Sequence, residues 1–122
     1  INDSYNANPD SMKAALDVLY NYSGKRKIAV LGTMGELGDY AHKAHTEVGE
    51  YAKDKVDILL TTGEFKKCYE EGCKHKCISC ENKEELVNKL KEYINDEDVI
   101  LVKASRSAKF EEIINEIDRI FE

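Results

Sequence analysis

Short apolar runs alternate along the chain with longer segments in which apolar residues recur every three or four positions. The short runs have the length and composition of buried strands. They lie at residues 27–31, 56–61 and 99–102, with a weaker run at residues 76–79. The longer segments have the spacing of amphipathic helices, whose apolar positions share one face. They cover residues 12–20, 40–51, 64–71, 86–94 and 110–121.

The alternation of strands and helices predicts a three-layer, Rossmann-like α/β sandwich with a mainly parallel sheet. Glycines at the ends of the apolar segments, such as Gly24 and Gly63, support these boundaries. Tyrosines are expected on the buried faces of the helices together with the aliphatic residues. These tyrosines are Tyr20, Tyr40, Tyr51 and Tyr93.

The composition is that of a water-soluble globular domain, with 42% hydrophobic and 34% charged residues. We therefore expect a single cytoplasmic domain over residues 1–122, with no signal peptide and no membrane span. The net charge of −6 argues against nucleic acid as a partner, because phosphate contacts need a basic face. The chain begins abruptly at Ile1 without a methionine, so we expect it to be part of a longer protein.

Polar groups gather where the first helix begins. Asn8 can cap that helix, and Pro9 suits its first position because the N–H that proline lacks would be unpaired there. Asp3 ends a presumed strand just before it, and Tyr5 and Asn6 lie between. Unpaired N–H groups at a helix start suit a nucleotide or carboxylate ligand. The alternative is a capped helix after a tight turn.

Two more candidate motifs follow predicted strands. The loop at residues 32–38 is rich in glycine and contains Glu36, but it matches neither a phosphate-binding P-loop nor a dinucleotide fingerprint. Residues 103–107 leave the last strand and are expected to open the last helix. Because parallel strands end at one edge of the sheet, we expect these two loops and the one after Asp3 to converge there.

Cysteine and histidine allow two interpretations. Cys68, Cys73, Cys77 and Cys80 are close in sequence and could bind zinc or an iron–sulfur cluster. Their spacing matches no standard paired motif, and Cys77 and Cys80 flank a strand, so ordinary cytosolic thiols without a metal are favoured. His45 lies on the second helix, where packing at a domain interface is the favoured role.

Four segments together resemble the C-terminal domain of a Mur ligase, most closely the MurF type, which adds D-alanyl-D-alanine to UDP-N-acetylmuramoyl-tripeptide in peptidoglycan synthesis. They span nearly the whole chain. They are DSYNANPDSM at 3–12, VLGTMGELG at 30–38, HTEVG at 45–49 and VKASRS at 102–107. The family usually has an acidic residue at the position of Thr33 and a glycine at that of Ala104.

The resemblance implies an ATP-dependent ligase in which the dipeptide amine attacks an acyl phosphate. It implies that Asp3 binds the ATP ribose, with Tyr5, Asn6 and Asn8 lining that site. It implies that the last loop holds the dipeptide carboxylate. The residues in that loop are Lys103, Ser105, Arg106 and Ser107.

The resemblance also assigns functions to protein outside this chain. Mg²⁺, the P-loop lysine and the UDP-sugar site belong to central and N-terminal domains that the chain lacks. We therefore expect the isolated chain to be inactive, and Glu36 and His45 to lie near an interface with those domains. The alternatives are another Mur or folylpolyglutamate-type ligase domain, or a non-catalytic Rossmann-like module with a cysteine metal site.

Overall fold

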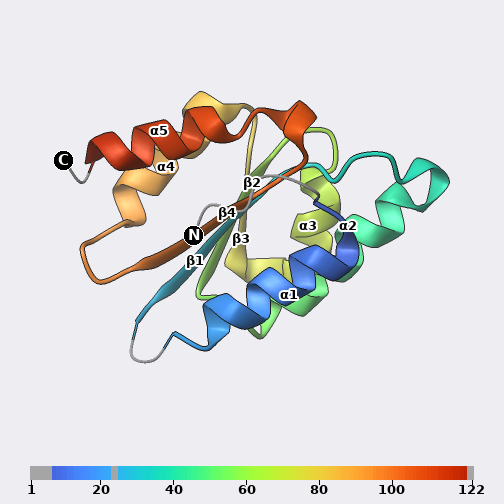
Figure 1. Ribbon diagram of the computed structural model, residues 1–122, viewed down its shortest axis with the longest axis horizontal. Helices are drawn as coiled ribbons and strands as arrows, with labels where there is room; N and C mark the ends of the chain where they lie inside the picture. Colours follow the sequence, from blue (N-terminus) through green and yellow to red (C-terminus); the bar gives the residue numbers. More distant parts are fainter. Residues whose placement is uncertain (1–6, 23–24, 121–122) are drawn as a thin grey trace.

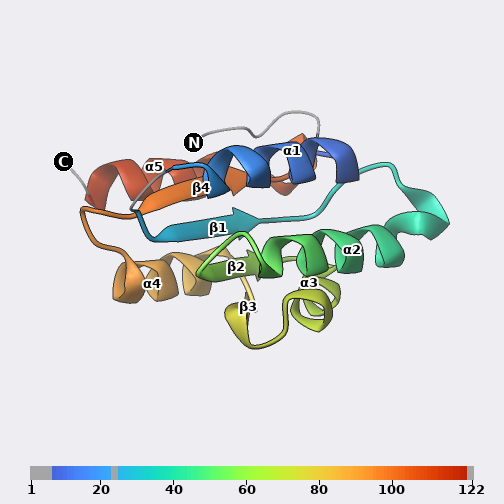
Figure 2. The same cartoon turned by 90° about the horizontal axis from the view of Figure 1, so that it is seen from below.

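In the part of the chain that the structure describes, four parallel strands form one sheet. The structure is a computed structural model that describes residues 7–22 and 25–120. The strands are β1 (Lys27–Leu31), β2 (Ile58–Thr62), β3 (Cys77–Cys80) and β4 (Val99–Lys103). Their spatial order is β3-β2-β1-β4, and every neighbouring pair is parallel. Figure 2 shows β4, β1 and β2 in succession with their arrowheads at the same end. The predicted parallel α/β fold is therefore confirmed.

Among the described residues, five α-helices connect and cover these strands. They are α1 (Pro9–Tyr20), α2 (Ala41–Lys53), α3 (Lys66–Cys73), α4 (Lys83–Tyr93) and α5 (Glu111–Ile120). Asparagine caps two of them: Asn8 Oδ1 accepts from the Ser11 N–H of α1, and Asn82 Oδ1 accepts from the Glu85 N–H of α4. Such caps satisfy N–H groups that have no partner inside the helix. None of the described helices is long and apolar enough to cross a membrane.

Helices cover both faces of the sheet, as Figure 1 shows. One core cluster joins the sheet to α1, α2 and α3, and the other joins it to α4 and α5. Successive residues of β1 point to opposite faces, so Ala29 and Leu31 enter the first cluster while Ile28 and Val30 enter the second. Both faces of β1 are buried, which explains why its sequence is a continuous apolar run instead of an alternating one.

The pair α2 and α3 packs unusually closely because each helix has a glycine at the contact. A Cβ at Gly72 of α3 would lie 2.3 Å from the Thr46 carbonyl oxygen of α2. A Cβ at Gly49 of α2 would lie 2.7 Å from the Tyr69 carbonyl oxygen of α3. Both obstacles are backbone atoms, so the approach of the two helices depends on the absence of side chains at these positions.

Two sequence predictions about helix faces and boundaries need correction. Tyr20, Tyr40 and Tyr93 were expected in the core but are exposed, with 52%, 43% and 37% of their surfaces accessible. Tyrosine tolerates such positions because its ring covers apolar neighbours while its hydroxyl meets water. The weak strand predicted at residues 76–79 is β3 at Cys77–Cys80, because Lys74–Lys76 form a 3₁₀ turn first.

Candidate functional site

The strand order places a topological switch point where β1 and β4 end. After β1 the chain passes to α2 on one face of the sheet, and after β4 it passes to α5 on the other face. The two loops that leave these neighbouring strands therefore diverge at the carboxyl edge. Ligands of open parallel sheets bind at such points. The loops are residues 32–38 and residues 104–110.

Main-chain hydrogen bonds join these two loops. The Gly32 N–H donates to the Lys103 carbonyl oxygen at 3.0 Å, and the Ser105 N–H donates to the Thr33 carbonyl oxygen at 2.8 Å. These bonds extend the β1–β4 pairing beyond the last paired residues, Leu31 and Lys103. The predicted convergence of the second and third motifs at one edge is therefore confirmed.

Two buried side chains from the helices hold the first loop. The Tyr69 hydroxyl of α3 donates to the Gly32 carbonyl oxygen at 2.6 Å. The Met34 N–H donates to His45 Nε2 of α2 at 2.9 Å, and His45 Nδ1 lies 2.6 Å from the Ala41 carbonyl oxygen. Nε2 must accept, so the proton of the neutral ring is on Nδ1, which donates to Ala41. The start of the loop is thus fixed on the body of the domain.

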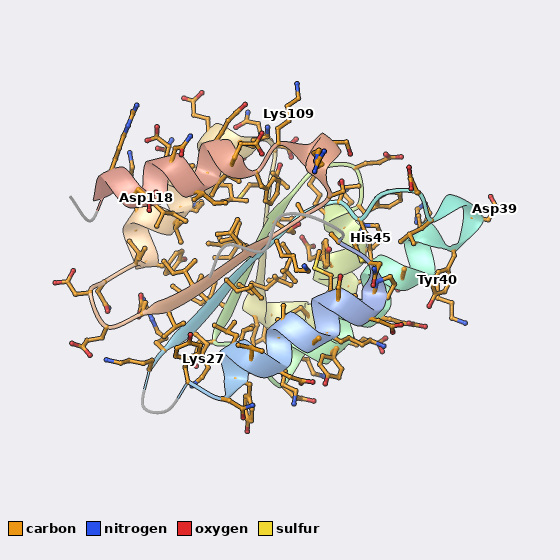
Figure 3. The ribbon with its side chains drawn as sticks, viewed as in Figure 1. Lys27, Asp39, Tyr40, His45, Lys109 and Asp118 are labelled. Atoms are coloured by element: carbon orange, nitrogen blue, oxygen red, sulfur yellow. The ribbon has the colours of Figure 1, made fainter. Side chains whose placement is uncertain are left out.

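His45 belongs to α2 and lies inside the domain (Figure 3), where its ring meets that of Tyr69 of α3 edge-on. Its side chain has no exposed surface, and its ring stacks on Phe65 with 4.2 Å between ring centroids. Burial lowers the pKa of His45 below its usual 6.5, although the hydrogen bond to Ala41 partly opposes this. The sequence predicts an interface position for His45, but the structure places its side chain in the interior, where it anchors the loop.

Gly32 allows the second loop to approach the first. A Cβ at this position would lie 2.4 Å from Phe110 Cζ and 2.8 Å from Ala104 Cβ. Phe110 itself is buried, with 2% of its surface exposed. The ring of Phe110 therefore occupies the space that any side chain at residue 32 would need.

The predicted substrate-binding residues lie at the end of β4 and directly after it, but they differ in exposure. Lys103 is almost fully buried, with 1% of its surface exposed, whereas Arg106 and Ser107 are exposed. Ser105 Oγ and Ser107 Oγ are 2.9 Å apart. A pair of adjacent hydroxyls beside a guanidinium can donate several hydrogen bonds to an anionic ligand.

These residues do not open the last helix, contrary to the sequence prediction. Arg106–Ala108 form a separate 3₁₀ turn, and Lys109 follows with a φ of 56°, in the left-handed region. Helix α5 begins only at Glu111. A left-handed residue interrupts helical hydrogen bonding. The N-terminal N–H groups of α5 are thus separated from Ser105 and Arg106 by this turn.

Of the four residues predicted to bind ATP, the structure describes only Asn8. Asp3, Tyr5 and Asn6 lie outside the described residues. Asn8 is exposed and forms a reciprocal capping box, in which its side chain accepts from the Ser11 N–H and Ser11 Oγ accepts from the Asn8 N–H. The capping role is confirmed, and a contact with nucleotide stays a prediction.

Glu36 lies at the exposed tip of the first loop with a φ of 59°. Left-handed backbone is unfavourable for glutamate, and such strain often occurs at functional positions. The 3₁₀ turn Gly38–Tyr40 follows, and Figure 3 shows Asp39 and Tyr40 at the outer end of this loop. The predicted contact of Glu36 with another domain stays a prediction.

The four cysteines do not assemble into a metal site. Cys73 and Cys77 face the core cluster of α1, α2 and α3, whereas Cys80 faces that of α4 and α5. Among the residues that the structure describes, no three His, Cys, Asp or Glu side chains are grouped so that they could hold a metal ion. The metal-binding module considered from the sequence therefore has no donor set in this part of the chain.

Several contributors to the site are not apparent from the sequence. In the sequence pattern, Tyr69 is only one position of a short predicted helix, and Phe110 is only one apolar position of the last predicted helix. Their contacts with Gly32 span 37 residues and 78 residues of sequence, respectively. Of the residues involved, only Gly32 gave a hint of these contacts in the sequence. A glycine directly after a buried strand often marks a place where another segment packs closely against the backbone.

Comparisons with known proteins agree with this geometry. The family model described as "Mur ligase, glutamate ligase domain" matches residues 1–106. The chain is 39% identical to the UDP-N-acetylmuramoyl-tripeptide--D-alanyl-D-alanine ligase of Bacillus subtilis, over 96% of this chain and 27% of that protein. It is 38% identical to the ligase of the same name from Escherichia coli, over 93% of this chain and 25% of that protein.

Solved structures give the same result. The MurF ligase from Thermotoga maritima, in complex with ADP, matches with a TM-score of 0.82 and 28% identity, over 96% of this chain and 27% of that chain. The UDP-N-acetylmuramoylalanyl-D-glutamyl-2,6-diaminopimelate--D-alanyl-D-alanyl ligase from Acinetobacter baumannii matches with a TM-score of 0.84 and 29% identity, over 96% of this chain and 26% of that chain. The chain spans about a quarter of the length of the curated relatives that it matches. It therefore belongs to the Mur ligase family, as a C-terminal domain of the MurF kind.

Proposed function

We propose that this chain is the C-terminal domain of an ATP-dependent ligase that adds D-alanyl-D-alanine to UDP-N-acetylmuramoyl-tripeptide. In this proposal the domain closes over ATP and binds the incoming dipeptide. The observation that carries it is the junction of the loops after β1 and β4, in a chain whose relatives carry that ligase name. The ADP in the Thermotoga maritima relative supports a nucleotide as one ligand.

The dipeptide would meet the loop after β4. Arg106 can hold a carboxylate with two parallel hydrogen bonds, which a lysine cannot. Ser105 and Ser107, whose hydroxyls are 2.9 Å apart, can donate to the same anion. With the carboxylate fixed, the dipeptide amine is the nucleophile, so this domain contributes orientation and not a reacting side chain.

ATP would meet the segment before α1. Asp3 can accept hydrogen bonds from the ribose hydroxyls, and Tyr5, Asn6 and Asn8 would line the same side. The proposal assigns Mg²⁺ and the phosphate-binding lysine to the central domain. The isolated chain is accordingly expected to show no ligase turnover, and steady turnover by these 122 residues alone would contradict the proposal.

Two substitutions in the complete ligase test the site. Arg106→Lys is expected to raise KM for D-alanyl-D-alanine by about tenfold, which corresponds to about 1.4 kcal/mol of lost binding. Asp3→Ala is expected to raise KM for ATP while leaving that for the dipeptide unchanged. Arg119→Lys is the matched control, because Arg119 is an exposed arginine of α5 that pairs with Glu116. The site assignment is wrong if both test variants retain the parental KM values.

A further inference from the structure

A cysteine and a histidine that the ligase proposal does not use lie in contact at the carboxyl edge of the sheet. His42 is in the first turn of α2, and Cys68 is in the first turn of α3. Cys68 Sγ is 3.4 Å from His42 Nδ1, within hydrogen-bond range for sulfur. We propose that Cys68 is a modification site, at which the thiol paired with His42 undergoes exchange with a low-molecular-weight disulfide.

The surroundings of the pair hold an imidazole against the thiol at the start of a helix. His42 is exposed and meets Phe65 edge-on, with 5.4 Å between ring centroids, which orients the imidazole. The first turn of α3 contains no acidic residue, and the positive end of its helix dipole lies beside Cys68. A thiol next to an imidazole at a helix start is the usual setting of a reactive cysteine.

The other three cysteines lack these features. Burial raises the pKa of Cys73 to about 11, that of Cys77 to about 12 and that of Cys80 to about 11. At neutral pH these three are almost entirely uncharged thiols, which are poor nucleophiles. Cys77 is nevertheless more exposed than Cys68, which has 9% of its surface accessible. Exposure alone would thus select Cys77, whereas the contact with His42 selects Cys68.

The exchange reaction is balanced without any other reagent. The thiol proton of Cys68 passes to His42 Nδ1, and the sulfur attacks one sulfur of the small disulfide. A new S–S bond forms to Cys68 while the original S–S bond breaks. The departing thiolate then takes a proton from the imidazolium, so the products are a mixed disulfide and one small thiol.

Oxidised glutathione is a suitable probe, applied to the 122-residue chain at pH 7.5. Samples are quenched in acid over time, and the occupancy of each cysteine is measured by peptide mass spectrometry. We expect Cys68 to be modified about tenfold faster than any other cysteine, because His42 Nδ1 can accept the thiol proton as the sulfur attacks, whereas burial keeps the other three thiols protonated. Cys68→Ser is expected to remove the fast phase entirely.

Two histidine variants separate activation from mere exposure. His42→Gln keeps a polar side chain but cannot carry the proton, so the rate at Cys68 should fall about tenfold while the other rates stay constant. His75→Gln, at an exposed histidine of the turn before β3, is the matched control and should leave Cys68 unchanged. Far-UV circular dichroism verifies the fold of each variant. Modification of Cys77 before Cys68, or an unchanged rate in His42→Gln, would overturn the proposal.

Discussion

The contact between α2 and α3 leads to a quantitative prediction for Gly72→Ala. The new Cβ would lie 2.3 Å from the Thr46 carbonyl oxygen and 2.7 Å from the Glu50 nitrogen. Favourable contacts between nonbonded heavy atoms begin near about 3.5 Å, so the helices must move apart by roughly 1 Å. Because both obstacles are backbone atoms, no change of rotamer relieves the collision.

Two opposing effects set the size of the change in stability. Forcing an extra methyl group into a well-packed interior costs about 1–3 kcal/mol, and the upper end applies because a whole helix must move. Alanine in place of glycine within a helix recovers at most about 1 kcal/mol. We expect the free energy of unfolding to fall by about 2 kcal/mol, which lowers Tm by about 8 °C for a domain of this size.

Urea unfolding followed by far-UV circular dichroism measures this difference. Gly35→Ala is the matched control, because a Cβ at Gly35 would lie 3.5 Å from Ser105 Cβ, an ordinary contact. Its free energy of unfolding should stay within about 0.5 kcal/mol of the parent. If Gly72→Ala has the same midpoint and slope as the parent, the glycine contact does not limit the approach of the two helices.

Two further predictions concern buried polar groups. Because burial lowers the pKa of His45, the unfolded chain takes up the proton first as the pH falls below 6.5, so the free energy of unfolding should decrease from there toward the native pKa. Urea unfolding at pH 7.5 and at pH 5.5 measures how much the free energy of unfolding changes between the two pH values. This change should be smaller for His45→Gln than for the parent, and equal changes would contradict the assignment to His45. Thr61 Oγ1 is buried without a hydrogen-bond partner in the described structure, so Thr61→Val should raise the free energy of unfolding by about 1 kcal/mol. An unchanged or lower thermal midpoint for Thr61→Val would show that the hydroxyl is satisfied.

The sequence predicts the sheet well because burial on both faces imposes a simple pattern. Residues 28–31 of β1 are all apolar, and β1, like β2, has a neighbouring strand on each side. The meeting of the loops after β1 and β4 was also predictable, since it follows from parallel strands that end at one edge. This inference needed only local sequence information: each of these two predicted strands is followed directly by a glycine or by a cluster of polar residues.

Contacts between distant segments could not be predicted in the same way. The hydrogen bond from Tyr69 to Gly32 depends on how α3 packs on α2, which periodicity does not specify. The separate turn at Arg106–Ala108 depends on the left-handed conformation of Lys109, a residue type with no preference for it. His45 was noticed as a motif residue, but its role follows only from the Met34 N–H that meets its ring.

The hydrogen bonds that join the loops after β1 and β4 run from main chain to main chain. Every amino acid offers the same carbonyl oxygen, so these bonds do not depend on the side chains at Thr33 and Lys103. During evolution, side chains at this edge of the sheet can therefore change while the backbone geometry of the junction stays the same. The condition is that residue 32 remains a glycine, because the Phe110 ring fills the space that a side chain there would need.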